Sequence, residues 1–107
     1  MGADFRYRQK MRFDWDERKA AANRRKHGIA FDEAITAFDD PNSLRAPDPG
    51  HSTPLEERSW LIGESDVGVL VVVFTVREPG AVVRLISARP SSRKERRRYE
   101  ESRRVSI

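Results

Sequence analysis

Hydrophobic and polar positions in the first third of the chain follow a helical spacing. Glu17–His27 contains three consecutive alanines, follows the possible capping residues Asp14 and Asp16, and precedes Gly28. A capping carboxylate at the start, good helix formers and a glycine just past the end predict a helix over Glu17–His27. Residues 31–38 repeat hydrophobic side chains at i, i+3, i+4 and i+7, which predicts a second short helix with one buried face.

Extended patterns flank these helices. Met11–Trp15 alternates hydrophobic and polar residues, which predicts a short strand. Three further strands are predicted at residues 58–63, 69–77 and 82–89, joined by short glycine-containing segments typical of antiparallel hairpins. Residues 41–54 are rich in Pro, Ser, Asp and Gly, and we interpret them as a loop or an irregular edge segment.

The C-terminal segment begins with a helix-capping sequence. Ser92 and Glu95 have the spacing of a capping box, so a last helix is predicted to run to about Arg103. Tyr99 is nearly its only large apolar residue, and we therefore expect the helix to present charge to a partner or to solvent. The element order predicts an α+β fold, with a small antiparallel sheet, helices packed on one of its faces, and a C-terminal helix.

Length and composition limit the domain organisation and the compartment. The 107 residues suit one domain, and we assign it to residues 11–107. Residues 1–10 are polar and basic, and we interpret them as an N-terminal extension that need not be ordered. The chain has no cysteine, no apolar run long enough for a membrane span and no apolar leader, so we expect a cytoplasmic protein with no membrane contact.

Positive charge is concentrated near the C-terminus. The formal net charge is +4, and residues 89–104 contain eight basic side chains and three acidic ones, a local excess of five. Such a cluster favours a polyanionic partner, and RNA fits best. The alternative is a solvated helix face that carries its own ion pairs.

Candidate chemistry rests on arginine and histidine. The sequence contains no metal-binding, P-loop or nucleotide-cofactor motif, so we expect no metal and no cofactor. RNA can be cleaved without a metal when a protein supplies a base, an acid and positive charge for the dianionic phosphorane. We identify Arg77, Arg84, Arg89 and His27 as the candidate catalytic residues. The alternative for the arginines is pairing with nearby carboxylates.

Whether the arginines share a face depends on strand register. If Arg77 pairs with Val82, then Thr75 lies opposite Arg84 and these side chains share a face with Arg77. A slip of one residue would move Arg84 to the other face.

Two other residue types remain open on the sequence alone. His27 could transfer protons or could interact with the end of its helix, and His51 lies in the 41–54 segment. Trp15 and Trp60 could stack on nucleobases or pack in the core, and Tyr99 has the same two interpretations.

Several segments together resemble the BrnT toxins of bacterial type II toxin–antitoxin systems. The resemblance covers most of the chain from Met11 to Glu101, and two of its blocks are specific in combination: residues 25–34 (RKHGIAFDEA) and residues 86–89 (ISAR). The other blocks are FDWD at 13–16, FDDP at 38–41, ER at 57–58, FTVRE at 74–78 and RKERRRYE at 93–100.

The resemblance implies a RelE-like fold and a growth-arresting ribonuclease. It also implies a BrnA-type antitoxin with a ribbon-helix-helix part, through which the complex contacts operator DNA. Carried over residue by residue, it implies site positions at Lys26, His27, Arg77, Arg84 and Arg89. Thr75 and Glu78 follow as neighbours that, with Lys26, contact substrate.

This sequence departs from the family pattern beside the proposed site. Pro90 stands where a basic residue is usual, and Val76 where an acidic residue is common. The alternative function is therefore a non-catalytic basic module that binds RNA or a protein partner.

Overall fold

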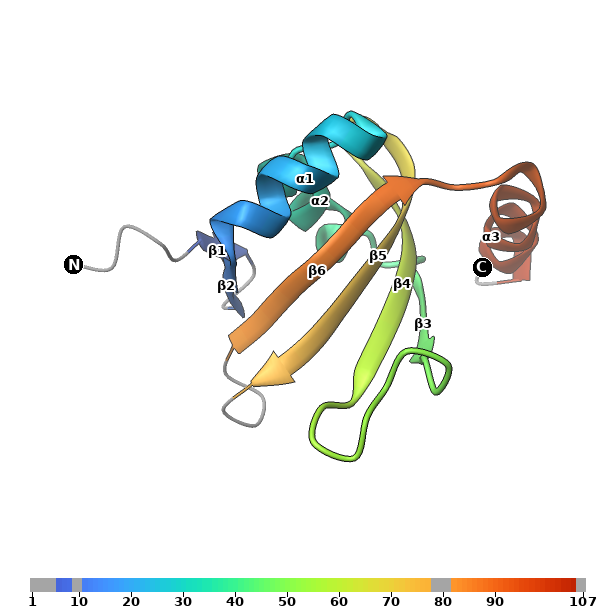
Figure 1. Ribbon diagram of the computed structural model, residues 1–107. Helices are drawn as coiled ribbons and strands as arrows, with labels where there is room; N and C mark the ends of the chain where they lie inside the picture. The colour runs from blue at the N-terminus through green and yellow to red at the C-terminus, as the bar shows by residue number, and fades with distance from the viewer. Residues whose placement is uncertain (1–5, 9–10, 78–81, 106–107) are drawn as a thin grey trace.

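A mixed sheet forms the centre of the computed structural model, which describes residues 6–8, 11–77 and 82–105 (Figure 1). Its strands are β1 (Arg6–Arg8), β2 (Met11–Trp15), β3 (Leu44–Pro47), β4 (Arg58–Ser65), β5 (Gly68–Arg77) and β6 (Val82–Pro90). They lie in the order β1-β2-β6-β5-β4-β3. The helices are α1 (Glu17–His27), α2 (Phe31–Ala34), the 3-10 helix η1 (Ile35–Asp39) and α3 (Arg93–Val105). No helix in the described part of the chain is both long enough and apolar enough to cross a bilayer.

Local capping explains where α1 begins and ends. The Asp16 side chain accepts hydrogen bonds from the backbone N–H groups of Arg18 (2.7 Å) and Lys19 (3.3 Å). Those two bonds lower the pKa of Asp16. At the other end Gly28 adopts φ 74° and donates its N–H to the Arg24 carbonyl, 2.9 Å away. The predicted helix over Glu17–His27 is confirmed.

The sheet and the second helix differ from the prediction. The sheet is not wholly antiparallel, because β2 runs parallel to β6, with Phe13 beside Val83. The chain continues from β2 into α1, so no hairpin turn determines that β6 pairs with β2 or in which direction. The second predicted helix is split into α2 and η1. The segment interpreted as a loop or irregular edge contains the edge strand β3, and part of the N-terminal extension forms β1.

One face of the sheet, the helix-covered face, packs against α1, α2 and η1. Phe38 of η1 is 4% exposed and meets Phe13 and Phe74 edge-on, with ring centroids 5.0 and 5.2 Å apart. Trp15 packs in the same way against Phe31 at 5.7 Å. Trp15 is therefore partly buried and packs against the core on the helix-covered face.

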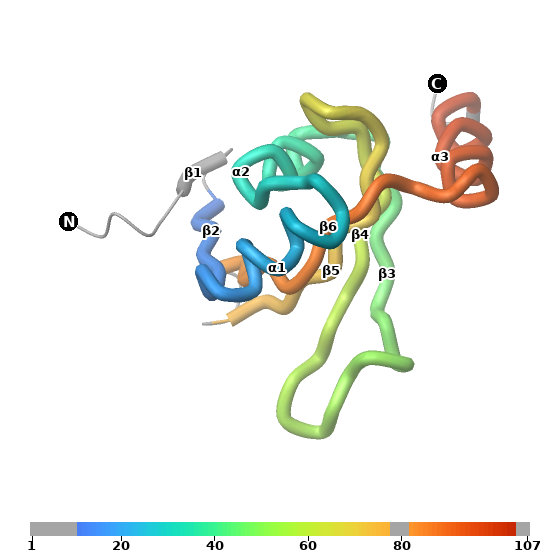
Figure 2. Tube along the Cα trace, turned by 45° about the horizontal axis from the view of Figure 1, so that its top comes forward, coloured from blue at the N-terminus to red at the C-terminus, as the bar shows by residue number. Residues whose placement is uncertain are grey.

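The opposite face, here called the open face, carries alternate residues of β4, β5 and β6. Its members are Arg58, Trp60, Ile62, Val71, Val73, Thr75, Arg77, Arg84, Ile86 and Arg89. Figures 1 and 2 show α3 on this side, away from α1 and α2. Not all helices therefore pack on one face.

Helix α3 is attached to the open face mainly through Tyr99. This side chain is 1% exposed and packs with Ile62, Val69 and Val71. Its hydroxyl donates a hydrogen bond to Asp40, and burial together with that carboxylate raises the pKa of Tyr99 to about 12. Most other α3 side chains are exposed, as the sequence predicted.

Candidate functional site

Strand register places the first two arginines on one face. Arg77 pairs with Val82, and Thr75 lies opposite Arg84. This is the register in which Arg77, Thr75 and Arg84 share a face of the sheet.

A β-bulge brings Arg89 to the same face. Arg84 and Arg89 are five residues apart, so a regular strand would point them to opposite sides. The pairing shifts between Phe74↔Leu85 and Val73↔Ser87, which leaves Ile86 as an extra residue in β6. Leu85 and Ala88 both pack in the core behind the sheet, and Arg89 consequently points to the open face.

Each of the three arginines is paired with a carboxylate. Arg77 contacts Glu56 at 3.2 Å, Arg84 contacts Asp14 at 3.2 Å, and Arg89 contacts Glu95 at 2.8 Å. The alternative interpretation of these arginines as ion-pair partners is thus also realised. The pairs remain accessible, because the three arginine side chains are 52%, 28% and 41% exposed.

The Arg89–Glu95 pair is the most strongly held of the three. Both guanidinium NH2 groups donate to the Glu95 carboxylate at 2.8 Å. The predicted capping box is present, since Glu95 accepts from the Ser92 N–H (2.8 Å) and Ser92 Oγ accepts from the Glu95 N–H (3.1 Å). The bonds from Arg89 lower the pKa of Glu95 to about 2, against the opposing effect of partial burial, and the pKa of Arg89 is raised in turn.

A cleft of about 540 Å³ opens beside α3 on the open face. It is lined by Lys26, His27, Asp48, His51, Arg58, Trp60, Ile62, Val71, Val73, Ile86, Ser87, Arg89, Glu95 and Arg98. Of the predicted site residues, the cleft brings together Lys26, His27 and Arg89. Arg77 and Thr75 line a smaller neighbouring cleft, Arg84 lines neither, and Glu78 lies outside the described residues.

Asn23 places the end of α1 beside the cleft. Its side-chain NH2 donates to the carbonyls of Ala88 (2.8 Å) and Ile29 (3.0 Å), and its oxygen accepts the Ala88 N–H (2.9 Å). Strand β2 pairs with β6 only as far as Leu85, so the Asn23 amide satisfies backbone groups beyond the end of β2. This contact fixes Lys26 and His27, one turn further along α1, next to Arg89.

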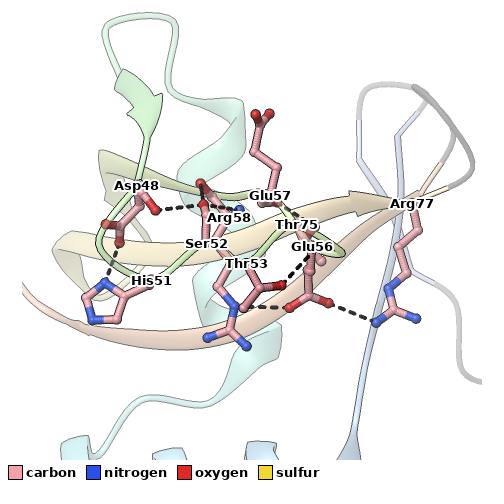
Figure 3. Close-up of polar contacts among 9 residues, drawn as sticks. All are labelled: Asp48, His51, Ser52, Thr53, Glu56, Glu57, Arg58, Thr75 and Arg77. Carbon is pink, nitrogen blue, oxygen red and sulfur yellow. Dashed lines mark hydrogen bonds and ion pairs between the residues drawn. The ribbon is translucent and has the colours of Figure 1, made fainter.

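The loop between β3 and β4, together with the first residue of β4, supplies site residues that were not predicted from the sequence. Figure 3 shows Glu56 between Arg58 and Arg77, accepting from Arg58 at 3.0 Å and from Arg77 at 3.2 Å. These bonds, from Arg58 first, lower the pKa of Glu56. Arg58 lines the main cleft and Glu56 lines the smaller one, so their ion pair connects the two clefts. The position of Arg58 at a strand end, like that of Arg77, was a signal available in the sequence.

His51 enters the cleft from the same loop. Its Nδ1 lies 2.8 Å from Asp48 Oδ2, and Ser52 Oγ joins this loop to Arg58 by accepting the Arg58 N–H at 2.9 Å (Figure 3). His27 and His51, far apart in sequence, therefore line one cleft. Thr75, by contrast, is 5% exposed, and its hydroxyl donates to the Glu57 carbonyl at 2.8 Å, which anchors the loop.

Charge in the cleft favours an anion. Its permanent cations are Lys26, Arg58, Arg89 and Arg98, which outnumber the acids Asp48 and Glu95 by four to two. The imidazoles of His27 and His51 add groups that can accept or donate a proton. Among the residues that the structure describes, no three His, Asp or Glu side chains are placed to hold a metal ion.

Comparison with known protein families finds a match. The family model described as the ribonuclease toxin BrnT of type II toxin–antitoxin systems matches residues 15–95. The match spans α1 through the first residues of α3 and includes the residues that line the cleft, apart from Arg98. A search of the curated proteins found no match.

Proposed function

This chain belongs to the family of BrnT ribonuclease toxins of type II toxin–antitoxin systems, and from that premise we propose that it is a metal-independent endoribonuclease that inhibits growth by cleaving RNA. The supporting observation is the cleft, where Lys26, His27 and Arg89 meet Arg58 and His51. A phosphodiester in this cleft would have both proton-transfer groups and guanidinium charge within one enclosure.

The proposed chemistry is an internal transesterification. The RNA 2′-hydroxyl attacks the adjacent phosphorus, so the 2′-O–P bond forms and the P–O5′ bond breaks, leaving a 2′,3′-cyclic phosphate and a 5′-hydroxyl. His51, whose Nδ1 faces Asp48 at 2.8 Å, presents its other ring nitrogen as the base for the 2′-hydroxyl proton. His27 donates a proton to the leaving O5′.

Arginine stabilises the charge that develops on the phosphate. The planar guanidinium of Arg89 can exchange the two oxygens of Glu95 for two phosphate oxygens, because both acceptors suit the same fork. Lys26 and Arg58 hold the neighbouring backbone. Arg77 and Arg84, which lie outside the main cleft, bind phosphates further along the RNA. Glu78, outside the described residues, remains a proposed substrate contact from the family resemblance.

The remaining properties extend the family membership. We assign the protein to the cytoplasm and to a RelE-like fold, with α3 beyond the antiparallel strands β4–β6 as support. Its partner is a BrnA-type antitoxin that neutralises it and contacts operator DNA. Helix α3 is suited to an acidic partner because its residues 93–105 contain seven basic side chains and three acidic ones.

Cleavage of single-stranded RNA by purified protein in EDTA tests the proposal. We expect the parent to cut and Arg89→Ala to cut about 10²–10³-fold more slowly, the usual loss on removing one charge-stabilising donor. Arg77→Ala should lose less, since Arg77 lines the neighbouring cleft. Arg18→Ala is the matched control, because Arg18 is exposed in the first turn of α1, at the end away from His27.

Two outcomes would contradict the proposal in different ways. Equal cleavage by the parent, Arg89→Ala and Arg18→Ala would leave a ribonuclease with its site elsewhere. Intact RNA after incubation with folded parent protein would remove the enzymatic activity itself.

A binding module is the second candidate. The observation that favours it is the pairing of Arg77, Arg84 and Arg89 with Glu56, Asp14 and Glu95, which partly neutralises all three. Uncut RNA together with binding that weakens steeply with salt would support this candidate.

A further inference from the structure

The floor of the cleft is apolar and incompletely covered. Tyr99 of α3 covers the end of the open face formed by Ile62, Val69 and Val71. Beyond it, Trp60, Val73 and Ile86 line the cleft. Trp60 is half-buried, whereas Tyr99 is 1% exposed. An apolar floor surrounded by polar groups, in a cavity within the usual range of about 300–1,000 Å³, is typical of a ligand site.

Trp60 has neighbours that differ from those of the core aromatic residues. Across the sheet it lies between Ala46 of β3 and Val73 of β5, which are both small. The core rings meet one another edge-on, but the contact recorded for the Trp60 ring is with Arg98, whose guanidinium carbon lies 6.0 Å from the ring centroid. A planar group stacked on the indole would move the Arg98 guanidinium outward and lie between the two, because two stacking layers of about 3.5 Å each exceed the 6.0 Å separation.

The rim of the cleft selects a planar ligand that carries negative charge beside it. Lys26, Arg58 and Arg89 surround the floor, so a phosphate attached to the planar group would meet cations on leaving the floor. Nucleobases stack on indole and guanidinium planes, and they are free to do so in single-stranded RNA, where they are not already paired.

We propose that Trp60 forms a nucleobase subsite, in which one unpaired base of single-stranded RNA stacks between the indole and Arg98 while its flanking phosphates contact Lys26 and Arg89. The proposal rests on the proposed function in taking RNA as the ligand and names the form of RNA bound. Stacking accepts every base, so the subsite discriminates single-stranded from double-stranded RNA more than it discriminates sequence.

Intrinsic fluorescence can test this subsite directly because the chain has two tryptophans on opposite faces of the sheet. Trp15→Phe leaves Trp60 as the sole reporter, and Trp60→Leu leaves Trp15. The probe is a dye-labelled 2′-O-methyl hexanucleotide, which lacks the attacking hydroxyl and cannot be cut, with binding followed separately by anisotropy. We expect saturable quenching in Trp15→Phe, no quenching in Trp60→Leu, and affinity about 5- to 150-fold weaker in Trp60→Leu.

Controls separate the base from the phosphates and from a protein ligand. An abasic oligomer of the same length should bind more weakly than the hexanucleotide and leave Trp60 fluorescence unchanged. Polyglutamate should leave it unchanged too. If Trp60→Leu fails to fold in urea titrations, the parent and Trp15→Phe still give the quenching comparison, and an Arg98→Ala variant tests the opposite wall of the subsite.

The contradicting outcomes are distinct from failure of the proposed function. Binding of the hexanucleotide without quenching of Trp60 would overturn the base subsite, whether or not the parent cleaves RNA. Quenching by polyglutamate but not by the hexanucleotide would assign the floor to a protein partner. Quenching by the hexanucleotide in a protein that cuts no RNA would support the subsite and leave the binding-module function.

Discussion

The two faces of the sheet are built from the same strands but differ in what covers them. On the helix-covered face, Phe13, Phe38 and Phe74 pack edge-on beneath α1, α2 and η1. On the open face, Tyr99 covers one end, and beyond it lies a cleft lined by cations and Trp60. Because strand residues alternate between faces, one strand can serve packing and ligand binding with successive side chains. Substitutions on the two faces should therefore separate stability from activity.

The largest change in stability is expected from the helix-covered face. Phe38→Ala removes a ring that is 4% exposed and contacts two other rings, so the free energy of unfolding should fall by about 3–5 kcal/mol. Urea titration followed by circular dichroism measures this. Leu55→Ala is the control, since Leu55 is 98% exposed and should change stability by about 0.5 kcal/mol or less. Equal losses would mean that the three rings do not form the stabilising core.

Asn23 is buried beneath α1 and also positions the end of α1 beside the cleft. Its replacement should therefore lower both the stability of the protein and its affinity for RNA. Asn23→Ala leaves the N–H and carbonyl of Ala88 without their side-chain partner in a buried site, so we expect a loss of about 2–4 kcal/mol in the free energy of unfolding. Affinity for the uncleavable hexanucleotide should also fall in the protein that remains folded, because α1 no longer fixes Lys26 and His27.

Asn42→Ala provides the matched control for Asn23. It removes the same amide from a loop where the Asn42 backbone N–H donates to Asp40 Oδ1 at 2.9 Å, and where its side chain makes no hydrogen bond to any residue that the structure describes. A loss of stability for Asn23→Ala with unchanged affinity would show that the cleft does not depend on this contact.

Local signals in the sequence were sufficient for several elements. Asp16 and Gly28 fixed the ends of α1, and Ser92 with Glu95 fixed the start of α3. These signals succeed because a helix cap is satisfied by residues within one turn. The short connection predicted between the strands ending at Arg77 and starting at Val82 likewise limited their register to two possibilities. The structure has the one in which Thr75 lies opposite Arg84.

Long-range features were beyond the sequence. The parallel pairing of β2 with β6 joins residues about seventy positions apart, and no local pattern encodes it. The bulge at Ile86 decides that Arg89 shares a face with Arg84, yet the sequence around it reads as a regular strand. His51 and Arg58 reach the cleft through the path of the β3–β4 loop, which hydrogen bonds such as that from Thr75 to Glu57 determine. The sequence shows that Tyr99 is nearly the only large apolar residue of its helix. Its role as the anchor of α3, however, depends on the residues of β4 and β5 that it packs against.

The smallest expected effect concerns the ion pair at the edge of the open face. The folded pKa of Glu95 is lowered to about 2, below its ordinary value of 4.5, so its contribution to stability is present above pH 4.5 and is lost as the pH falls toward 2. Glu95→Gln keeps an acceptor for the Ser92 N–H but removes the charge that pairs with Arg89. We expect it to reduce the free energy of unfolding at pH 7 by about 1 kcal/mol or less, given the partial solvent exposure of the pair.

Glu100→Gln, on the same helix, is the matched control for Glu95→Gln. Glu100 pairs with Arg96 at 3.3 Å, and both of these side chains are more than half exposed. Urea titrations from pH 6 to pH 2 should show a shallower loss of stability for Glu95→Gln than for the parent, and the parent's slope for Glu100→Gln. Release of Arg89 should also strengthen binding of the uncleavable hexanucleotide in Glu95→Gln. Identical pH profiles for the two variants would mean that Glu95 is an ordinary surface carboxylate and that Arg89 is already free to bind phosphate.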